Sequence, residues 1–124
     1  GLVIYATYAD LGGLAREICD TRLPPGTGWL AKRVAIPLAS LHAGANLQVF
    51  RPVDHVAKLA GRPLFLIHGT RDQMIPIAHA RALYAAAPGP RRLIELDADH
   101  NAIIDDEPTA RAAAEFFDAP AAER

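Results

Sequence analysis

Two short runs with the pattern of β-strands, each followed by a polar loop and then a helical pattern, constrain this 124-residue chain more than any other feature. The runs cover residues 63–68 and 92–97, and the stretches after them repeat apolar residues at the i, i+3, i+4 spacing of an amphipathic helix. A third run, over residues 2–6, is apolar. Strands that alternate with helices form parallel sheets. The sequence therefore predicts an α/β fold with three parallel strands and flanking helices.

A helical insertion is expected between the first and second strands, over about residues 10–60. Residues 10–22 have helical spacing, and a second helical stretch covers residues 29–41. We expect Pro37 to kink or divide that stretch, because proline removes a backbone N–H from the helix interior. Pro52 is placed in the first turn of a short helix that is expected to end near Ala60; in a first turn the missing N–H costs nothing.

Composition narrows the class of protein. Thirteen basic and fourteen acidic residues leave a net charge of -1, which argues against nucleic-acid and anionic-membrane partners. No run of about 18 apolar residues is present, so no membrane-spanning helix is expected. Cys19 is the single cysteine, which excludes an internal disulfide and favours a reducing, cytoplasmic setting. We place one domain over residues 1–118 and a tail over residues 119–124.

Asp72 and His100 lie just past the ends of the second and third strands. Functional side chains of parallel sheets gather at the carboxyl edge of the strands. One helix and one strand separate the two residues, so a single crossover can bring their loops together. An acid that orients a basic imidazole is what a nucleophilic hydrolase needs. The alternatives are that the aspartate caps the next helix and that the histidine is solvated.

Two segments resemble α/β-hydrolases. Residues 62–76, Arg-Pro-Leu-Phe-Leu-Ile-His-Gly-Thr-Arg-Asp-Gln-Met-Ile-Pro, resemble the late strand and acid turn of that family, and residues 93–102 resemble its last strand and histidine loop. The resemblance extends more loosely back to Leu2. It implies the C-terminal part of an α/β-hydrolase, with Asp72 as the acid and His100 as the base of a catalytic triad. Among subgroups, the chain is most similar to serine hydrolases with esterase-, thioesterase- and aminopeptidase-like members.

The chain departs from the family at the nucleophile. It contains no G-x-S-x-G elbow, and Ser40, its one serine, lies between Ala39 and Leu41 in a predicted helix. The family's oxyanion-hole loop is absent as well. We therefore expect a C-terminal portion of a serine hydrolase acting on small-molecule esters, thioesters or amides, inactive alone. The resemblance implies no cofactor and no metal, with water as the co-substrate.

The other residues that could take part in chemistry are better explained by structural roles. His68 is expected to pack beside the Asp72 turn, and Cys19 to be a small core residue. Four carboxylates near His100 could suggest a metal site, but their spacing matches no firm metal-ligand pattern. They are better explained as loop and helix-cap residues: Asp97, Asp99, Asp105 and Asp106. An apolar helical face in the insertion either lines an acyl-binding cap, as the resemblance implies, or packs on the sheet: Trp29, Leu30, Val34 and Leu38.

Two rival functions stay open. The chain could be a non-catalytic remnant or interaction module, because an exposed edge on strand 2–6 offers unpaired backbone groups to a second copy or a partner chain. It could also be a small regulatory domain that uses Asp72 as a phosphoacceptor or metal ligand. That second alternative leaves His100 and the turn of residues 69–72 without an explanation.

Overall fold

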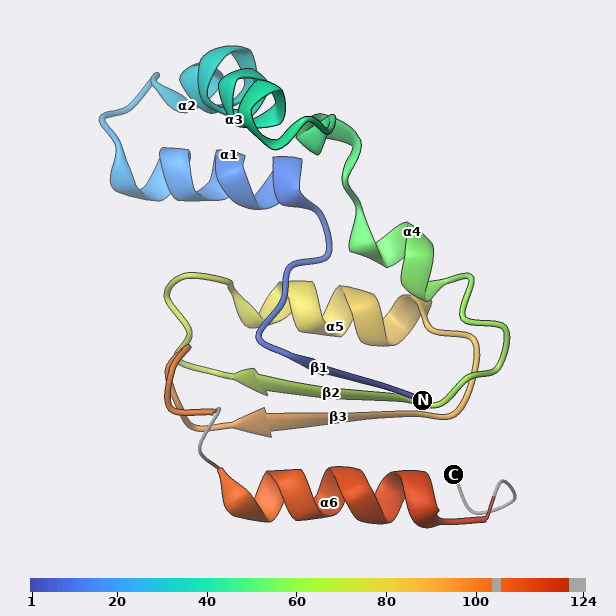
Figure 1. The fold of residues 1–124 in the computed structure, drawn as a ribbon. Helices are drawn as coiled ribbons and strands as arrows, with labels where there is room; N and C mark the ends of the chain where they lie inside the picture. Colours follow the sequence, from blue (N-terminus) through green and yellow to red (C-terminus); the bar gives the residue numbers. More distant parts are fainter. Residues whose placement is uncertain (104–105, 121–124) are drawn as a thin grey trace. The chain divides into compact units, whose positions relative to one another are not determined.

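The computed structural model describes residues 1–103 and 106–120 (Figure 1). Most of the predicted tail, residues 121–124, lies outside this range. In chain order the elements are β1 (Leu2–Tyr5), α1 (Leu11–Arg22), α2 (Gly28–Leu30), the π-helix η1 (Ala31–Ala35), α3 (Ile36–Ala43), the 3-10 helix η2 (Leu47–Val49), α4 (Pro52–Val56), β2 (Leu64–Gly69), α5 (Ile77–Ala86), β3 (Arg91–Leu96) and α6 (Glu107–Asp118).

The three strands form one parallel sheet in the order β1-β2-β3. Leu2 pairs with Leu64 across the first ladder, and Gly69 pairs with Leu96 at the end of the second. The strand boundaries lie within one residue of those expected from the sequence. The predicted α/β class, with three parallel strands and flanking helices, is confirmed.

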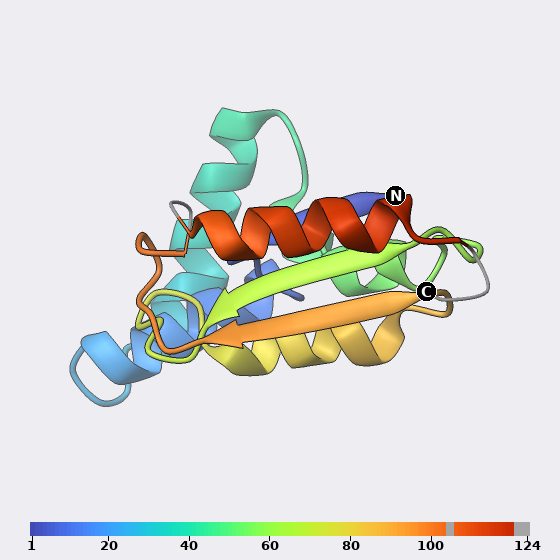
Figure 2. The same cartoon turned by 90° about the horizontal axis from the view of Figure 1, so that it is seen from below.

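Helices α5 and α6 cover opposite faces of this sheet (Figures 1 and 2). On one face Leu66 of β2 packs with Leu83 of α5, and on the other Phe65 packs with Phe116 of α6. Every residue of β2 is buried, because the strand lies between β1 and β3 and has a helix on each side. A strand buried on both faces reads as a continuous apolar run, which is why this element was visible in the sequence.

The chain divides into two compact units, one formed by residues 1–9 with 53–124 and the other by residues 10–52. The second unit contains α1 to η2 and covers most of the predicted helical insertion, while Val56 of α4 packs in the core of the first unit. Pro37 lies in the first turn of α3, directly after the π-helical stretch η1. It therefore marks the division of the predicted helix, at a position where its missing N–H is tolerated.

The prediction that Cys19 is a small core residue is wrong. Cys19 is only half-buried and is not part of the buried core. On the predicted apolar face of the insertion, Trp29 is 59% and Leu38 61% accessible. Within the described ranges, no helix combines the length and apolar character needed to cross a membrane.

Candidate active site

Asp72 lies in the tight turn that follows β2, and its side chain is fully buried. The turn closes when the Asp72 N–H donates to the carbonyl of Gly69. One carboxylate oxygen, Oδ1, accepts hydrogen bonds from the backbone N–H groups of Met74 and Ile75, both at 2.8 Å. The carboxylate is thus held by its own turn, which leaves Oδ2 for another partner.

The partner of Asp72 Oδ2 is His100, which lies in the loop after β3. Its Nδ1 lies 2.7 Å from Asp72 Oδ2, and its side chain is 26% exposed. The loop is shaped by Asp99, whose Oδ1 accepts from the backbone N–H groups of Asn101 and Ala102 at 3.0 Å. The structure therefore brings together the two residues that the sequence singled out, although they are 28 positions apart.

The two loops are joined through their backbones. The Thr70 N–H donates to the carbonyl of Leu96 at 2.7 Å, and the Arg71 N–H donates to the carbonyl of Ala98 at 3.1 Å. Gly69 lies so close to Ala98 that a Cβ atom at Gly69 would collide with the Ala98 carbonyl oxygen. These contacts fix the distance between the turn after β2 that carries Asp72 (the acid turn) and the loop after β3 that carries His100 (the histidine loop).

The surroundings of Asp72 favour its ionised form. Burial raises the pKa of the carboxyl group, but the hydrogen bonds from Ile75, His100 and Met74, together with the charge interaction with His100, outweigh burial. The pKa of Asp72 consequently lies below its usual value. A carboxylate accepts only, so its bond to His100 places the imidazole hydrogen on Nδ1 and leaves Nε2 with a lone pair.

In this arrangement His100 Nε2 is chemically able to accept a proton. Its Nε2 forms no hydrogen bond to any residue that the structure describes, and the imidazole is partly accessible. When Nε2 takes a proton, the adjacent carboxylate stabilises the resulting cation. Both oxygens of Asp72 are engaged and buried, which leaves none open to a phosphoryl group and argues against the phosphoacceptor interpretation.

The neighbouring carboxylates have structural partners. Asp97 is exposed and pairs with Arg71, whose Nε lies 2.9 Å from Asp97 Oδ1. Asp106 caps α6 by accepting from the Thr109 N–H at 3.0 Å. Together with the turn formed by Asp99, these contacts agree with the loop and helix-cap interpretation. Asp105 lies outside the described residues.

The hydroxyl group of Ser40 is hydrogen-bonded within the second unit. Its hydroxyl donates to the carbonyl of Ile36 at 2.7 Å and accepts from the Leu47 N–H at 3.0 Å. A hydroxyl with both bonds inside its own unit lacks the exposure of a nucleophile on a strained turn. Among the described residues, Asp72 and His100 are therefore paired with one another, and Ser40 is not arranged as a nucleophile would be.

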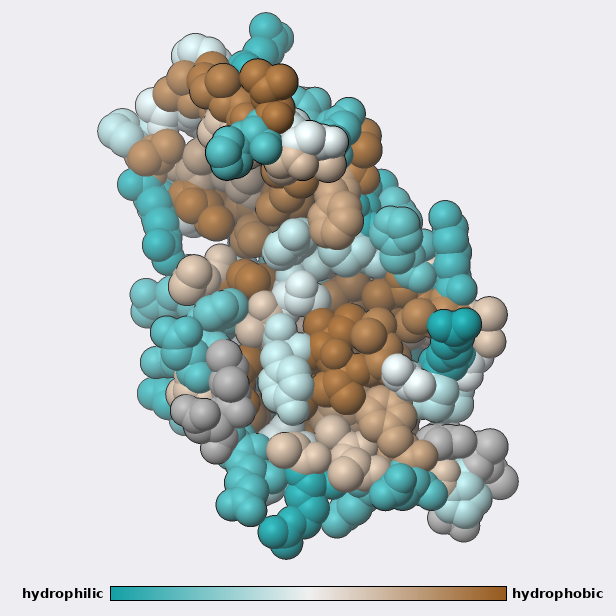
Figure 3. Space-filling model, viewed as in Figure 1, coloured by the Kyte–Doolittle hydropathy of each residue, from teal (hydrophilic) through white to brown (hydrophobic). Residues whose placement is uncertain are grey.

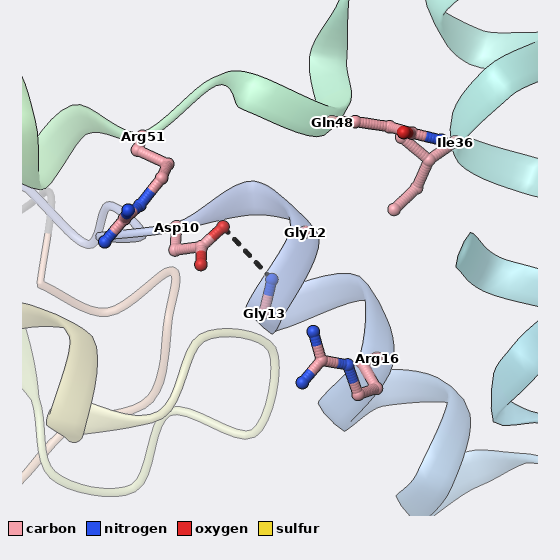
Figure 4. Close-up of a pocket in the computed structure, with 7 residues that line it drawn as sticks. All are labelled: Asp10, Gly12, Gly13, Arg16, Ile36, Gln48 and Arg51. Carbon is pink, nitrogen blue, oxygen red and sulfur yellow. Dashed lines mark hydrogen bonds between the residues drawn. The ribbon is translucent and has the colours of Figure 1, made fainter.

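A separate hollow of about 250 Å³ lies in the second unit (Figure 4). Its described lining residues are Asp10, Gly12, Gly13, Arg16, Ile36, Gln48 and Arg51. Asp10 accepts from the Gly13 N–H at 3.2 Å and so caps α1. None of these lining residues is a histidine, so this hollow holds no imidazole base, and we retain Asp72 and His100 as the candidate site.

Two supporting features of the site are not among the predictions from the sequence. Asp99 was assigned only a general loop role, although it organises the turn that carries His100. The need for glycine at position 69 was not recognised, because its cause is a contact with a loop 29 residues later in the chain. A glycine that directly ends a buried strand before a candidate aspartate is the signal that could have indicated it.

Comparisons with known proteins bear on the fold. No family model matches the chain. The uncharacterized protein YfhR of Escherichia coli is 30% identical over 100 residues, which are 80% of this chain and 28% of YfhR. A hydrolase from Pseudomonas aeruginosa matches at 20% identity with a TM-score of 0.57, over 95% of this chain and 55% of that one. The esterase Pf2001 of Pyrococcus furiosus matches at 24% identity with a TM-score of 0.55, over 93% of this chain and 42% of that one.

These likenesses establish the fold. The chain has the α/β-hydrolase fold, as the resemblance of its two late segments implied. It spans about a quarter to a half of the length of the proteins that it matches.

Proposed function

We propose that this chain supplies the acid and the base of a serine hydrolase, as the C-terminal portion of an enzyme that cleaves carboxylic esters, thioesters or amides. The observation that carries the proposal is the 2.7 Å contact between His100 Nδ1 and Asp72 Oδ2 at the carboxyl end of a parallel sheet. The likeness in fold to a hydrolase and an esterase supports it.

In the proposed reaction, His100 Nε2 takes the proton of a serine hydroxyl as its oxygen attacks the carbonyl carbon of the substrate. Asp72 stabilises the imidazolium that forms and holds its ring in place. His100 then returns the proton to the leaving alcohol, thiol or amine, and an acyl-enzyme remains. A water molecule, deprotonated by His100, releases the acid and regenerates the serine.

The serine itself is proposed to come from polypeptide other than residues 1–124. Ser40, the single serine of the chain, is engaged within its own unit. In the resembling family the nucleophile precedes the acid and the histidine in the chain. A strand that carries it would pair along the free side of β1, where Leu2, Val3 and Tyr5 are exposed.

The test uses the native polypeptide that contains residues 1–124, assayed with nitrophenyl esters, acyl thioesters and anilides. We expect hydrolysis, and we expect kcat to fall by roughly 10⁴-fold in Asp72→Asn and by roughly 10⁶-fold in His100→Ala. His42→Ala, which changes an exposed histidine of the second unit, is the matched control and should leave kcat unchanged. Full activity in His100→Ala would overturn the proposal.

The alternative is a non-catalytic module that associates through the edge of β1. A single observation favours it: apolar residues gather over β1 on the surface of the first unit (Figure 3), where three large side chains are more than a third exposed. Unpaired backbone groups on such an edge promote strand pairing between chains. Sedimentation of the 124-residue chain decides this point, because a monomer at high micromolar concentration excludes self-association through this edge.

A further inference from the structure

His68 is a buried imidazole in the middle of the sheet. It is the fifth residue of the central strand β2 and is 1% exposed. The four residues before it are apolar and pack against α5 or α6. A buried polar ring destabilises a core unless hydrogen bonds replace those lost with water. An imidazole at this position therefore calls for hydrogen bonds within the protein.

One nitrogen of the ring is used, and it faces the acid turn. His68 Nε2 lies 2.7 Å from the carbonyl oxygen of Ile75 and 3.5 Å from Asp72 Oδ2. A carbonyl oxygen only accepts, so Nε2 carries the hydrogen and donates it. The other nitrogen, Nδ1, has no hydrogen-bond partner among the described residues. The hydrogen bonding of His68 is thus directed to the turn that holds Asp72.

The neighbouring carboxylate on β3 does not compete for this hydrogen. Glu95 is paired with His68 in the strand register, but both of its oxygens bind the guanidinium of Arg81, at 2.9 and 2.8 Å. The acid turn is accordingly the element to which His68 donates.

We propose that His68 is a positioning residue for Asp72: its Nε2–H holds the Ile75 carbonyl and so closes the turn whose N–H groups hold the Asp72 carboxylate. Ile75 is bonded on both sides, through its carbonyl to His68 and through its N–H to Asp72 Oδ1. Asp72 Oδ2 then faces His100 at 2.7 Å. A reacting group that is displaced by about 1 Å can lose up to about a hundredfold in rate. The effect on catalysis rests on the proposed hydrolase function, whereas the effect on the turn does not.

A matched pair of variants separates this role from plain packing. Glutamine and methionine have side chains of nearly the same length, but only the glutamine carries an N–H that can replace Nε2–H. In the 124-residue chain, we expect His68→Met to raise the pKa of Asp72 toward its ordinary value, measured by carboxyl carbon NMR, while His68→Gln keeps it lowered. In the native hydrolase, His68→Met should lower kcat by tenfold or more with little change in KM, and His68→Gln should restore most of the loss.

Each result decides the inference. An Asp72 pKa that is unchanged in His68→Met, or equal losses of kcat in both variants, would overturn the positioning role. If the methionine variant does not fold, nitrogen NMR of the unmodified chain replaces it: a hydrogen on Nε2 of His68 supports the proposal, and a hydrogen on Nδ1 alone overturns it. If the native polypeptide hydrolyses no substrate, the proposed function fails, but the Asp72 titration still tests the role of His68.

Discussion

Gly69 lies against the backbone carbonyl of Ala98, with no space between them for a side chain. Gly69 ends the central strand β2, and Ala98 belongs to the loop that carries His100 two residues later. The Arg71 N–H donates to the same Ala98 carbonyl at 3.1 Å. The distance between Asp72 and His100 therefore depends on a close approach of two backbones, which only glycine at position 69 permits.

Gly69→Ala should displace the histidine loop. The added Cβ would collide with a backbone carbonyl that is already hydrogen-bonded, so the loop must move, at a cost of about 1–3 kcal/mol in the free energy of unfolding. We expect a lower urea midpoint and loss of the downfield proton resonance of the His100–Asp72 bond. Gly12→Ala is the control, since its Cβ would make only ordinary contacts at 3.5 and 3.6 Å and α1 should gain helix propensity. Equal behaviour of the two variants would contradict the prediction.

Asp72 should make the stability of the chain depend on pH below neutrality. Its folded-state pKa is lowered by hydrogen bonds from Ile75, His100 and Met74 that outweigh burial. A depressed carboxyl pKa contributes stability that is present above the unfolded value of about 3.9 and is lost as pH falls through the folded value. The free energy of unfolding should therefore fall more steeply below about pH 4 in the unmodified chain than in Asp72→Asn.

Denaturant titrations across pH 2–7 measure this difference. Asp97→Asn removes an exposed carboxylate near the same site and corrects for the loss of one charge. Parallel pH profiles for the unmodified chain and Asp72→Asn would show that the Asp72 carboxyl does not contribute in this way.

The central strand β2 was predictable because its residues are buried on both faces. In β2, Leu66 and Phe65 contact different helices, so no polar residue interrupts the apolar run. The two loop residues Asp72 and His100 were predictable because parallel strands end at a common edge. Helix α4 was expected to end near residue 60 but ends at Val56, because the chain turns there and Ala60 takes a positive φ before β2.

The supporting contacts of the site could not be predicted in the same way. The bond from His68 to Ile75 joins a strand to a loop, and the contact of Gly69 with Ala98 joins the end of that strand to a second loop. Neither leaves a periodic pattern, because each involves one atom of one residue. The partner of the apolar face that includes Trp29 could not be predicted either, since helical periodicity identifies an apolar face but not what covers it.

Asp99→Ala should loosen the histidine loop without touching the reacting atoms. Asp99 Oδ1 accepts from the N–H groups of Asn101 and Ala102, so its removal frees both donors and should cost about 0.5–2 kcal/mol, as for a lost helix cap. In the native polypeptide we expect a lower kcat, because His100 samples more orientations. Asp99→Asn keeps the accepting oxygen and should behave like the unmodified protein. An alanine variant with full stability and full kcat would show that the loop is held by other contacts.

Ser40→Ala should leave the chemistry of the native polypeptide unchanged and lower only the stability of the second unit. The hydroxyl bonds the Ile36 carbonyl and the Leu47 N–H, so its loss leaves the Leu47 donor unpaired and should cost about 1–3 kcal/mol. A fluorophosphonate probe, which labels activated serines, should not react with the 124-residue chain, and it should label native Ser40→Ala protein as fully as the unmodified form. Thr27→Ala is a suitable control, because its hydroxyl also donates to a backbone carbonyl within the second unit but is exposed. Labelling of Ser40 in the isolated chain would make this residue the nucleophile and refute the view that the serine lies elsewhere.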